Sequence, residues 1–276
     1  MKRIVKILWM GIIALTVFSG CEDVAKNVKL PPVEKKIVVQ CFISPDDDFI
    51  NALVSWSKPV VGSSLDDEPE YIITAKVEIS DGTNTGIMLW DESMELYVLP
   101  GSSFPIEAGK KYFLTVSLPD GKKVTSTCQV PLTQNKTFVL SKIDSLEEDT
   151  WGTTLITCTF KYKDHEPSVK NYYRVDGSPK LYDFDEELGG EFKEDSEFQT
   201  DYLFKLSFYE SAVQFSRKAN AWIINGDYNY YMYHKTLQGA QRNFGLFSEP
   251  SIVYSNIEGG IGCFGAYNSY GVEVDL

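Results

Sequence analysis

Short apolar runs with a two-residue period dominate the chain after residue 35. Because successive side chains of a strand point to opposite faces, this period predicts β-strands with one buried face. Turn signals such as Asp81-Gly82 and Pro119-Asp120-Gly121 separate the runs. The predicted strands of this first region cover residues 36–43, 52–57, 73–80, 86–90, 95–99, 111–118 and 122–130. Seven short strands without a helical period are typical of an immunoglobulin-like or prealbumin-like β-sandwich, which we predict for residues 36–131.

The β-rich pattern continues beyond a polar segment at residues 131–136, which we interpret as a domain boundary. Further strands are predicted at residues 137–143, 153–163, 171–177, 202–209 and 221–225, with a last strand over residues 264–274. Residues 228–242 favour a helix, because several aromatic and apolar side chains partly share a face at helical spacing. The acidic, glycine-broken stretch 181–199 is predicted to be an exposed loop. The predicted fold class is therefore mainly β, and residues 136–276 form a second β-rich domain that carries one helix.

The N-terminus has the pattern of a cleavable export signal. Three basic residues within the first six positions precede an apolar run over residues 7–18. The run is shorter than the roughly 20 residues that a membrane-spanning helix needs, but it has the length of a signal-peptide core. Ser19-Gly20-Cys21 matches the end of a bacterial lipobox, with small residues at the scissile bond and a thiol to carry the lipid. We predict a lipoprotein signal peptide at residues 1–20 and lipid on Cys21; the alternative is an ordinary secretory signal followed by an incidental cysteine.

Charge and composition limit what the mature chain binds. Residues 22–35 are polar, contain two adjacent prolines and lack periodicity, so residues 21–35 are predicted to form a lipidated tether. Removal of residues 1–20, which carry three basic residues and no acidic residue, lowers the net charge from −13 to −16. So acidic a chain offers no basic patch to displace counterions from phosphate, which excludes nucleic acid as a partner. The membrane contact is expected through the lipid on Cys21.

Four cysteines remain after Cys21. Cys41 lies on the first predicted strand of the sandwich and Cys128 on its last, and such strands are often neighbours. These two cysteines are therefore the candidate pair for a disulfide in an exported protein. The alternative is two small buried thiols, which is the favoured interpretation for Cys158 and Cys263. None of the spacings resembles a zinc site.

Candidate catalytic and metal-binding residues form no recognisable constellation. The two histidines, His165 and His234, are better explained as structural residues, and no GxSxG motif is present. Acidic clusters occur within residues 46–48, 66–70 and 183–187, where solvated loops are the simplest explanation. A cation site or a pair of carboxylates for glycoside hydrolysis is the alternative. We expect no cofactor, no metal and no enzymatic activity.

Two further motifs resemble binding sites and also have structural explanations. GIGCFG (260–265) fits the GxGxxG pattern, but a nucleotide site needs a helix after it, and the chain ends eleven residues later. A turn in which backbone packs closely is the favoured explanation. The aromatic cluster Tyr228, Tyr230, Tyr231 and Tyr233 is a candidate platform for a sugar or peptide. The favoured explanation is that these rings dock the predicted helix against a sheet.

The order of these pieces resembles a large lipoprotein family of Bacteroidota, known as domain of unknown function 4249. The resemblance spans nearly the whole mature chain, and no catalytic residues are known for the family. The segments that carry it are KIVVQCFI (36–43), AKVEISDG (75–82), GKKYFLTV (109–116), FKYKD (160–164), NYYR (171–174) and the closing EPSIVYSNIEGGIGCFGAY (249–267). The family's genes often neighbour those of TonB-dependent outer-membrane receptors, so the resemblance implies such a receptor as a partner.

Two shorter motifs fit the same setting. Cys21-Glu22-Asp23 looks like the acidic export signal that sends such lipoproteins to the outer face of the outer membrane. Asp144-Ser145-Leu146 resembles the acceptor that Bacteroidota use for O-glycosylation of exported proteins, which makes Ser145 a candidate site. The expected location is therefore the outer membrane, with the lipid-anchored chain facing the cell surface.

The resulting hypothesis is a non-enzymatic accessory lipoprotein that works with a TonB-dependent receptor in nutrient binding or uptake. The ligand class stays open among small molecules, glycans and peptides. The alternative function is a structural or adhesive cell-surface protein that handles no solute. A carboxylate-dependent hydrolase is a third hypothesis.

Overall fold

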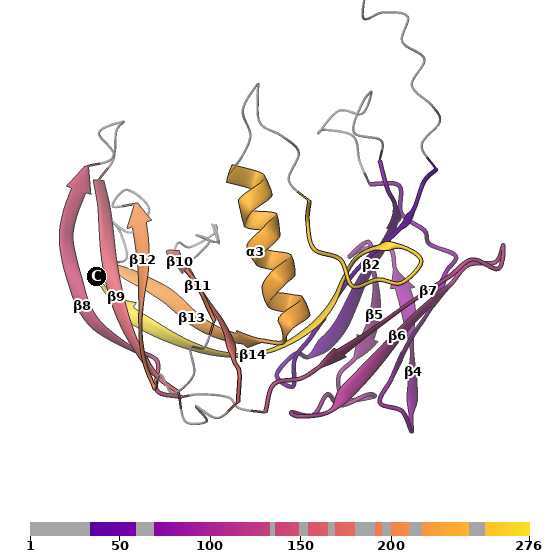
Figure 1. Cartoon of the computed structure of the whole chain (residues 1–276), viewed down its shortest axis with the longest axis horizontal. Helices are drawn as coiled ribbons and strands as arrows, with labels where there is room; N and C mark the ends of the chain where they lie inside the picture. Colours follow the sequence, from indigo (N-terminus) through magenta and orange to yellow (C-terminus); the bar gives the residue numbers. More distant parts are fainter. Residues whose placement is uncertain are drawn as a thin grey trace, which may run out of the picture. The chain divides into compact units, whose positions relative to one another are not determined.

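The computed structural model of this chain describes residues 34–58, 69–132, 136–148, 154–164, 169–179, 191–194, 200–209, 217–242 and 252–276. The strands and the helix within these ranges belong to one compact unit, Lys36–Leu276. The fold is mainly β, as predicted: an eleven-stranded mixed sheet, a three-stranded sheet and helix α3 (Figure 1). Within the described ranges, no helix is both long and apolar enough to cross a membrane.

The first seven strands lie where the two-residue period predicts them. Their bounds are β1 (Ile37–Ile43), β2 (Phe49–Trp56), β3 (Lys76–Ser80), β4 (Thr85–Asp91), β5 (Leu96–Pro100), β6 (Lys111–Ser117) and β7 (Lys123–Gln129). Every second residue of β1 is buried, and the same alternation runs through β3, β6 and β7. The inward side chains form a first hydrophobic cluster, which includes Val39, Ala52, Val77, Tyr97 and Leu114.

The remaining strands build a second, more aromatic cluster. Their bounds are β8 (Val139–Glu148), β9 (Thr154–Lys163), β10 (Tyr172–Pro179), β11 (Phe192–Glu194), β12 (Asp201–Tyr209), β13 (Lys218–Gly226) and β14 (Ile261–Asp275), and α3 spans Tyr228–Arg242. The three-stranded sheet β12-β9-β8 packs against β10 and β13. Phe138 stacks on Phe160 with ring centroids 4.7 Å apart, and Tyr162 meets Tyr173 edge to face at 4.9 Å. Aromatic contacts of this kind add to the stabilisation from burial.

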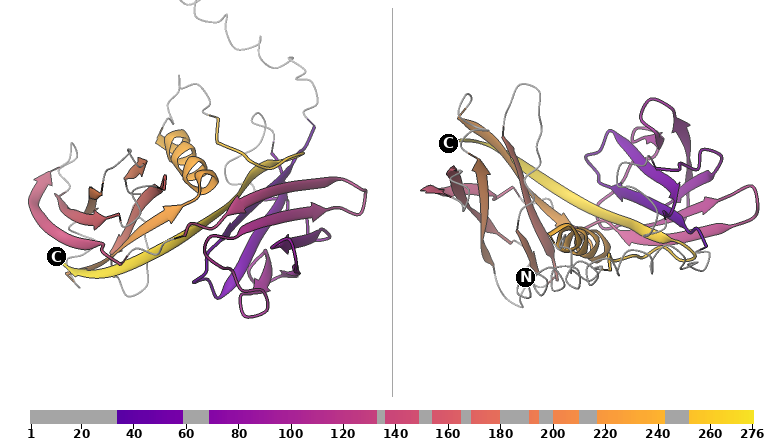
Figure 2. Two further views of the ribbon diagram at one scale, coloured as in Figure 1. Left: turned by 60° about the horizontal axis from the view of Figure 1, so that its bottom comes forward. Right: turned by 90° about the horizontal axis from the view of Figure 1, so that it is seen from above.

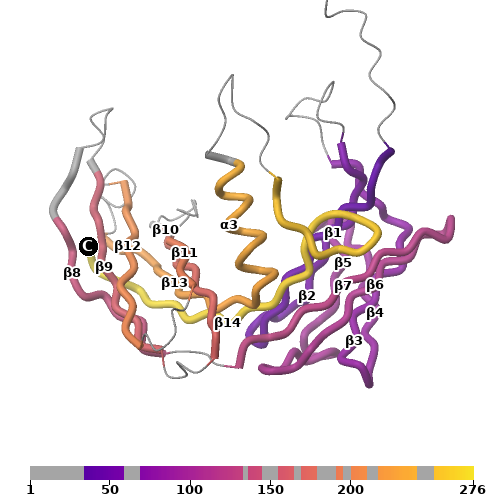
Figure 3. The backbone as a smooth tube through the Cα atoms, in the orientation of Figure 1, coloured from indigo at the N-terminus to yellow at the C-terminus, as the bar shows by residue number. Residues whose placement is uncertain are grey.

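Strand β14 joins the two regions into one sheet. Ile261–Ala266 pair in parallel with β1, whereas Tyr267–Asp275 pair antiparallel with β13. The strand therefore exchanges one partner for another between two successive residues. The tube in Figure 3 shows the yellow C-terminal strand beside the indigo β1, and Figure 2 shows α3 lying along the same strand.

The glycines that precede and begin β14 allow its close approach to β1. A Cβ at Gly262 would lie 2.0 Å from the carbonyl oxygen of Val39, and one at Gly260 would lie 2.5 Å from that of Ile37. Gly262 also has a φ of +116°, a conformation that side-chain-bearing residues rarely adopt. Close backbone packing, the favoured explanation of the GxGxxG pattern, is confirmed.

The segment that precedes β14 covers the free edge of β7. Thr125 and Glu258 exchange two backbone hydrogen bonds, from Glu258 N to Thr125 O at 2.8 Å and in the reverse sense at 3.2 Å. The Asn256 side chain joins the two strands, since its Nδ2 donates to Thr127 O and to Phe264 O. An exposed strand edge invites pairing with other chains, and this segment satisfies the edge within the fold.

Two predictions need correction. The stretch 181–199 is not entirely loop, because Phe192–Glu194 form β11 against β10. The possible disulfide between Cys41 and Cys128 is not formed, since both thiols are buried and free. Burial raises the pKa of Cys41 to about 12 and that of Cys128 as well, so both side chains are neutral thiols at physiological pH. The division into two domains near residue 131 stays a prediction.

Replacing Gly262 tests the β1–β14 contact. Gly262→Ala combines a positive φ with a backbone clash, whereas Gly121→Ala has a positive φ of +88° and no atom within 4 Å of the added Cβ. The Gly121 variant is expected to lose about 1 kcal/mol of unfolding free energy in urea titrations. The Gly262 variant is expected to lose at least about 2 kcal/mol more, since backbone must move. Equal losses in the two variants would contradict the contact.

Candidate functional site

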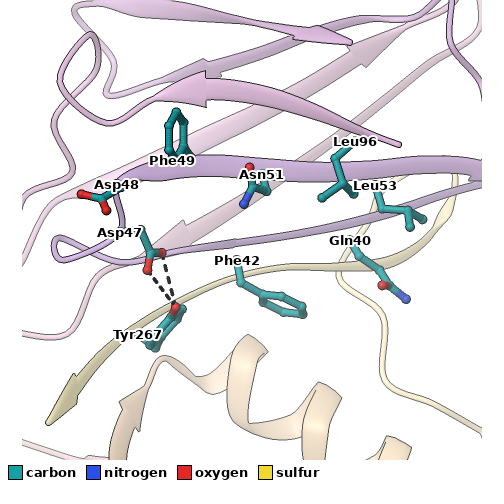
Figure 4. A pocket seen from close by; sticks show the side chains of 9 residues that line it. All are labelled: Gln40, Phe42, Asp47, Asp48, Phe49, Asn51, Leu53, Leu96 and Tyr267. Carbon is teal, nitrogen blue, oxygen red and sulfur yellow. Dashed lines mark hydrogen bonds between the residues drawn. The ribbon is translucent and has the colours of Figure 1, made fainter. Parts of the chain in front are cut away.

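A cleft lies on the face of the sheet that carries α3. Strand alternation buries Val39 and Cys41 in the first cluster, so Gln40 and Phe42 of β1 point to the opposite face. The same face carries outward residues of β2 and β5, and the region that α3 leaves open has a volume of about 490 Å³. We call this space the helix-side cleft. Its lining is Gln40, Phe42, Asp47, Asp48, Phe49, Asn51, Leu53, Leu96 and Tyr267 (Figure 4).

Asp227 fixes where the helix begins. It directly precedes α3, and its Oδ1 accepts a hydrogen bond of 2.8 Å from Tyr230 N, the usual action of an N-cap aspartate. The same oxygen accepts from Ala266 N at 3.3 Å, and Oδ2 accepts from Gln129 N at 3.2 Å. One carboxylate therefore holds α3, β14 and the end of β7 together, at the residue where β14 changes partners.

Aromatic rings then dock α3 beside the cleft. Phe42 of β1 lies 5.4 Å from Tyr230, 5.6 Å from Tyr233 and 5.0 Å from His234, measured between ring centroids. Tyr230 also lies 5.0 Å from Tyr267 of β14. The helix can come this close because a Cβ on the strand at Gly265 would lie 2.9 Å from the backbone of Tyr230.

Hydrogen bonds hold two polar residues of the cleft lining, Gln40 and Asp47, in place. Gln40 Nε2 donates to the Tyr233 hydroxyl at 2.7 Å. The Tyr267 hydroxyl lies 3.1 Å from Asp47 Oδ1 and 3.3 Å from Oδ2, and donates its proton to this carboxylate. Burial raises the pKa of Asp47, and the Tyr267 hydrogen bond opposes that rise. Burial also raises the pKa of Tyr267, with Asp47 as the next cause. Tyr267 therefore stays protonated and fixes the orientation of Asp47.

The floor of the cleft alternates between amide and apolar side chains. Gln40 stands opposite Leu53, and Phe42 stands opposite Asn51, in the β1–β2 register. The β2–β5 register ends at Ala52 and Tyr97, directly before Leu53 and directly after Leu96 in the sequence. Asp48 and Phe49 are exposed at the acidic end, where 46% of the Phe49 side chain is accessible. The lining therefore combines carboxylates at one end with amides and apolar side chains along the strands.

Three of the four tyrosines of the candidate platform dock the helix, which is the explanation that the sequence favours. Tyr230, Tyr231 and Tyr233 are buried and dock α3 against the sheet. Only Tyr228 is exposed. Helical spacing identified these rings correctly as one group but gave no information on which side of the helix meets solvent.

Only some of the other predicted site residues lie within the described ranges. Of the acidic clusters, residues 46–48 border the helix-side cleft, whereas residues 66–68 and 183–187 lie outside the described ranges. Ser145 belongs to β8, but its side chain is not described. Cys21, Glu22, Asp23 and His165 lie outside the described residues. Among the described residues, no three His, Cys, Asp or Glu side chains are grouped so that they could hold a metal ion.

Sequence reasoning missed most residues of the cleft. Gln40, Asn51 and Leu53 are outward positions of ordinary amphipathic strands, and nothing in the local pattern separates them from other surface residues. Tyr267 ends the closing segment 249–267, but no sequence motif marks it as a ligand residue. Only the acidic residues 46–48 drew attention in advance.

A smaller cleft lies over β6 and β7, with a volume of about 320 Å³. Its two amide side chains already serve the fold: Asn229 binds Thr127 O and accepts from Tyr254, and Asn256 clamps β7 to β14. The helix-side cleft is larger and has more side chains that are not committed in this way, so it is the stronger candidate site.

His234 is a structural residue of the ring cluster that docks α3. Its ring contacts Phe42, Tyr230 and Tyr233, and its buried Nε2 has no hydrogen-bond partner in the described part of the chain. Burial, with a contribution from the charge of Arg174, lowers the pKa of His234 from 6.5 to about 3. The ring is therefore neutral at physiological pH.

Comparison with known proteins gives one family. The model of the family described as Domain of unknown function (DUF4249) matches residues 25–271. No curated protein matches the chain.

The N-cap carboxylate makes stability depend on pH. Burial raises the pKa of Asp227 from 3.8 to about 6, against the hydrogen bonds that it accepts. The folded state therefore binds the proton more tightly, and this contribution to stability is full below pH 3.8 and is lost as the pH rises through 6. Asp227→Asn removes the titration and keeps an N-cap acceptor. The unfolding free energy of the wild type relative to this variant should fall between pH 4 and pH 6.5; a constant or rising difference would contradict the burial.

His234 should act in the opposite direction. Because the pKa of His234 is lowered in the folded state, the neutral ring contributes to folding stability in full above pH 6.5. This contribution is lost as the pH falls towards 3, because the unfolded chain takes up the proton first. His234→Phe removes this loss and preserves an aromatic ring in the cluster. Urea titrations at several pH values should show the variant gaining stability relative to the wild type as the pH falls below 6.5. If the unfolding free energies of the wild type and of His234→Phe changed in parallel with pH, the His234 ring would be solvated and the burial contradicted.

Proposed function

Since the chain belongs to the family described as Domain of unknown function (DUF4249), its role has to be argued from its own residues, and we propose that it binds a nutrient at the cell surface. In this proposal it is a non-enzymatic, lipid-anchored outer-membrane protein that serves as an accessory to a TonB-dependent receptor. The lipobox-like Ser19-Gly20-Cys21 and the acids Glu22 and Asp23 support the location.

One observation carries the binding role. The helix-side cleft has about 490 Å³ of space, within the range of small-ligand sites, and it is lined by both polar and apolar side chains. Two lining residues, Phe42 and Tyr267, pack against Tyr230 of α3, so this side of the site is organised before a ligand arrives. A preorganised site loses less free energy in ordering its residues on binding.

The rest of the chain serves as scaffold in this proposal. We assign β1–β7 to an immunoglobulin-like or prealbumin-like sandwich that ends near residue 131, with residues 136–276 as the second β-rich domain. Ser145 of β8 is kept as the candidate O-glycosylation site. The tether at residues 21–35 would place the cleft above the membrane, within reach of a receptor.

The receptor partnership is tested in the native membrane. The tagged, lipidated protein is purified in mild detergent and its partners are identified by mass spectrometry. A TonB-dependent receptor is expected in stoichiometric amount, and Cys21→Ser should abolish its recovery because the unanchored chain leaves the membrane. Recovery of the wild-type lipoprotein alone would favour the structural or adhesive alternative.

The binding role is tested by filling the cleft. Asn51→Trp adds a large ring at an exposed strand position inside the cleft, and Ile87→Trp adds the same ring at an exposed position of β4 outside it. The full mature proteins are incubated with a mixed pool of oligosaccharides and peptides, and retained solutes are read by native mass spectrometry. The wild type and Ile87→Trp should retain a solute that Asn51→Trp loses by at least about tenfold. Equal retention by all three proteins would place binding elsewhere.

A further inference from the structure

The helix-side cleft has a chemical polarity that identifies a class of ligand. Building on the proposed binding role, we propose that it takes a short peptide with apolar side chains and a free N-terminal amine. Three features of the cleft support this ligand: its acidic end, the placement of its two amides, and its apolar floor.

The acidic end suits an ammonium group. Asp47 and Asp48 both line the cleft, and Tyr267 holds the Asp47 carboxylate in place through its donated hydrogen bond. Asp48 is exposed at the same end. Among the described residues, the lining contains no lysine or arginine to neutralise these carboxylates. The chain also carries a net charge of −13, which attracts cationic ligands over distances of about 10 Å at moderate ionic strength.

The two amides, Gln40 and Asn51, lie diagonally across from each other on neighbouring strands, and each is followed by an apolar residue two positions along its strand. Gln40 and Phe42 are two residues apart on β1, which corresponds to about 7 Å along the strand. Asn51 and Leu53 repeat that spacing on β2, in register with them. A peptide lying along these strands presents its own amide groups at the same period. Gln40 Nε2 donates its hydrogen bond to the Tyr233 hydroxyl. In this proposal, Gln40 Oε1 accepts a hydrogen bond from a peptide N–H.

The apolar positions complete the match. Leu53 and Leu96 both line the cleft, each one residue beyond the paired Ala52 and Tyr97, and Phe42 lies diagonally across from Leu53. Phe49 adds an exposed ring near the acidic end. From Phe49 to Leu53 the strand advances about 14 Å, which is the length of a fully extended peptide of about four residues. Flat aromatic surfaces alone would favour sugar rings, but two leucines favour aliphatic side chains.

The test uses a peptide whose amine can be blocked. Tri-leucine and N-acetyl-tri-leucine are titrated into the full mature protein at pH 7 by calorimetry, with maltotriose as a neutral carbohydrate probe. Tri-leucine is expected to bind, and acetylation should weaken its binding about tenfold because the ammonium is lost. Asp48→Asn should weaken binding of tri-leucine and leave the affinity for N-acetyl-tri-leucine unchanged. Asp120→Asn, an exposed carboxylate in the β6–β7 turn, is the matched control and should change neither.

The outcomes separate this inference from the proposed function. Equal affinity for the free and acetylated peptides would overturn the amine end of the proposal. Binding of maltotriose, lost in Asn51→Trp while tri-leucine does not bind, would overturn the peptide class and leave the proposed function intact. Failure of the cleft-filling variant to change retention of any solute from the mixed pool would overturn both.

Discussion

The exchange of partners by β14 is the constraint on which the rest of the structure depends. One strand pairs with β1 through Ala266 and with β13 from Tyr267 onward, so the strands of both regions form one sheet. Asp227 binds the strand at this point through both its backbone and its side chain, and the same carboxylate begins α3. The position of the helix and the pairing of the strands are therefore determined together.

The helix-side cleft follows from this arrangement. Gly265 lets α3 lie against β14, and the rings of Tyr230 and Tyr233 carry the contact across to Phe42 of β1. Outward residues of β1, β2 and β5, together with Tyr267 and the turn that contains Asp47, line the open space. Tyr267, the first residue of β14 to pair with β13, reaches back to orient Asp47 at the end of that space.

Local patterns predicted the elements well and their assembly poorly. The two-residue period located the strands of both regions, and helical spacing located residues 228–242. β11 escaped notice because Phe192 is a single apolar residue among charged and glycine neighbours. The pairing of β1 with β14 joins positions more than 200 residues apart, and no local signal encodes it. The cleft depends on that pairing, so its amide and apolar residues could not be distinguished from an ordinary exposed strand face.

Amide hydrogen exchange on the full mature protein tests the central claim most directly, namely that the sheet face beside α3 is the binding site. Exchange is compared by mass spectrometry with and without the solute that the wild type retains. Slower exchange should concentrate in β1, β2 and the turn that contains Asp47, with α3 also protected. Protection confined to β6, β7 and the segment around Asn256 would place the ligand in the smaller cleft and contradict the account.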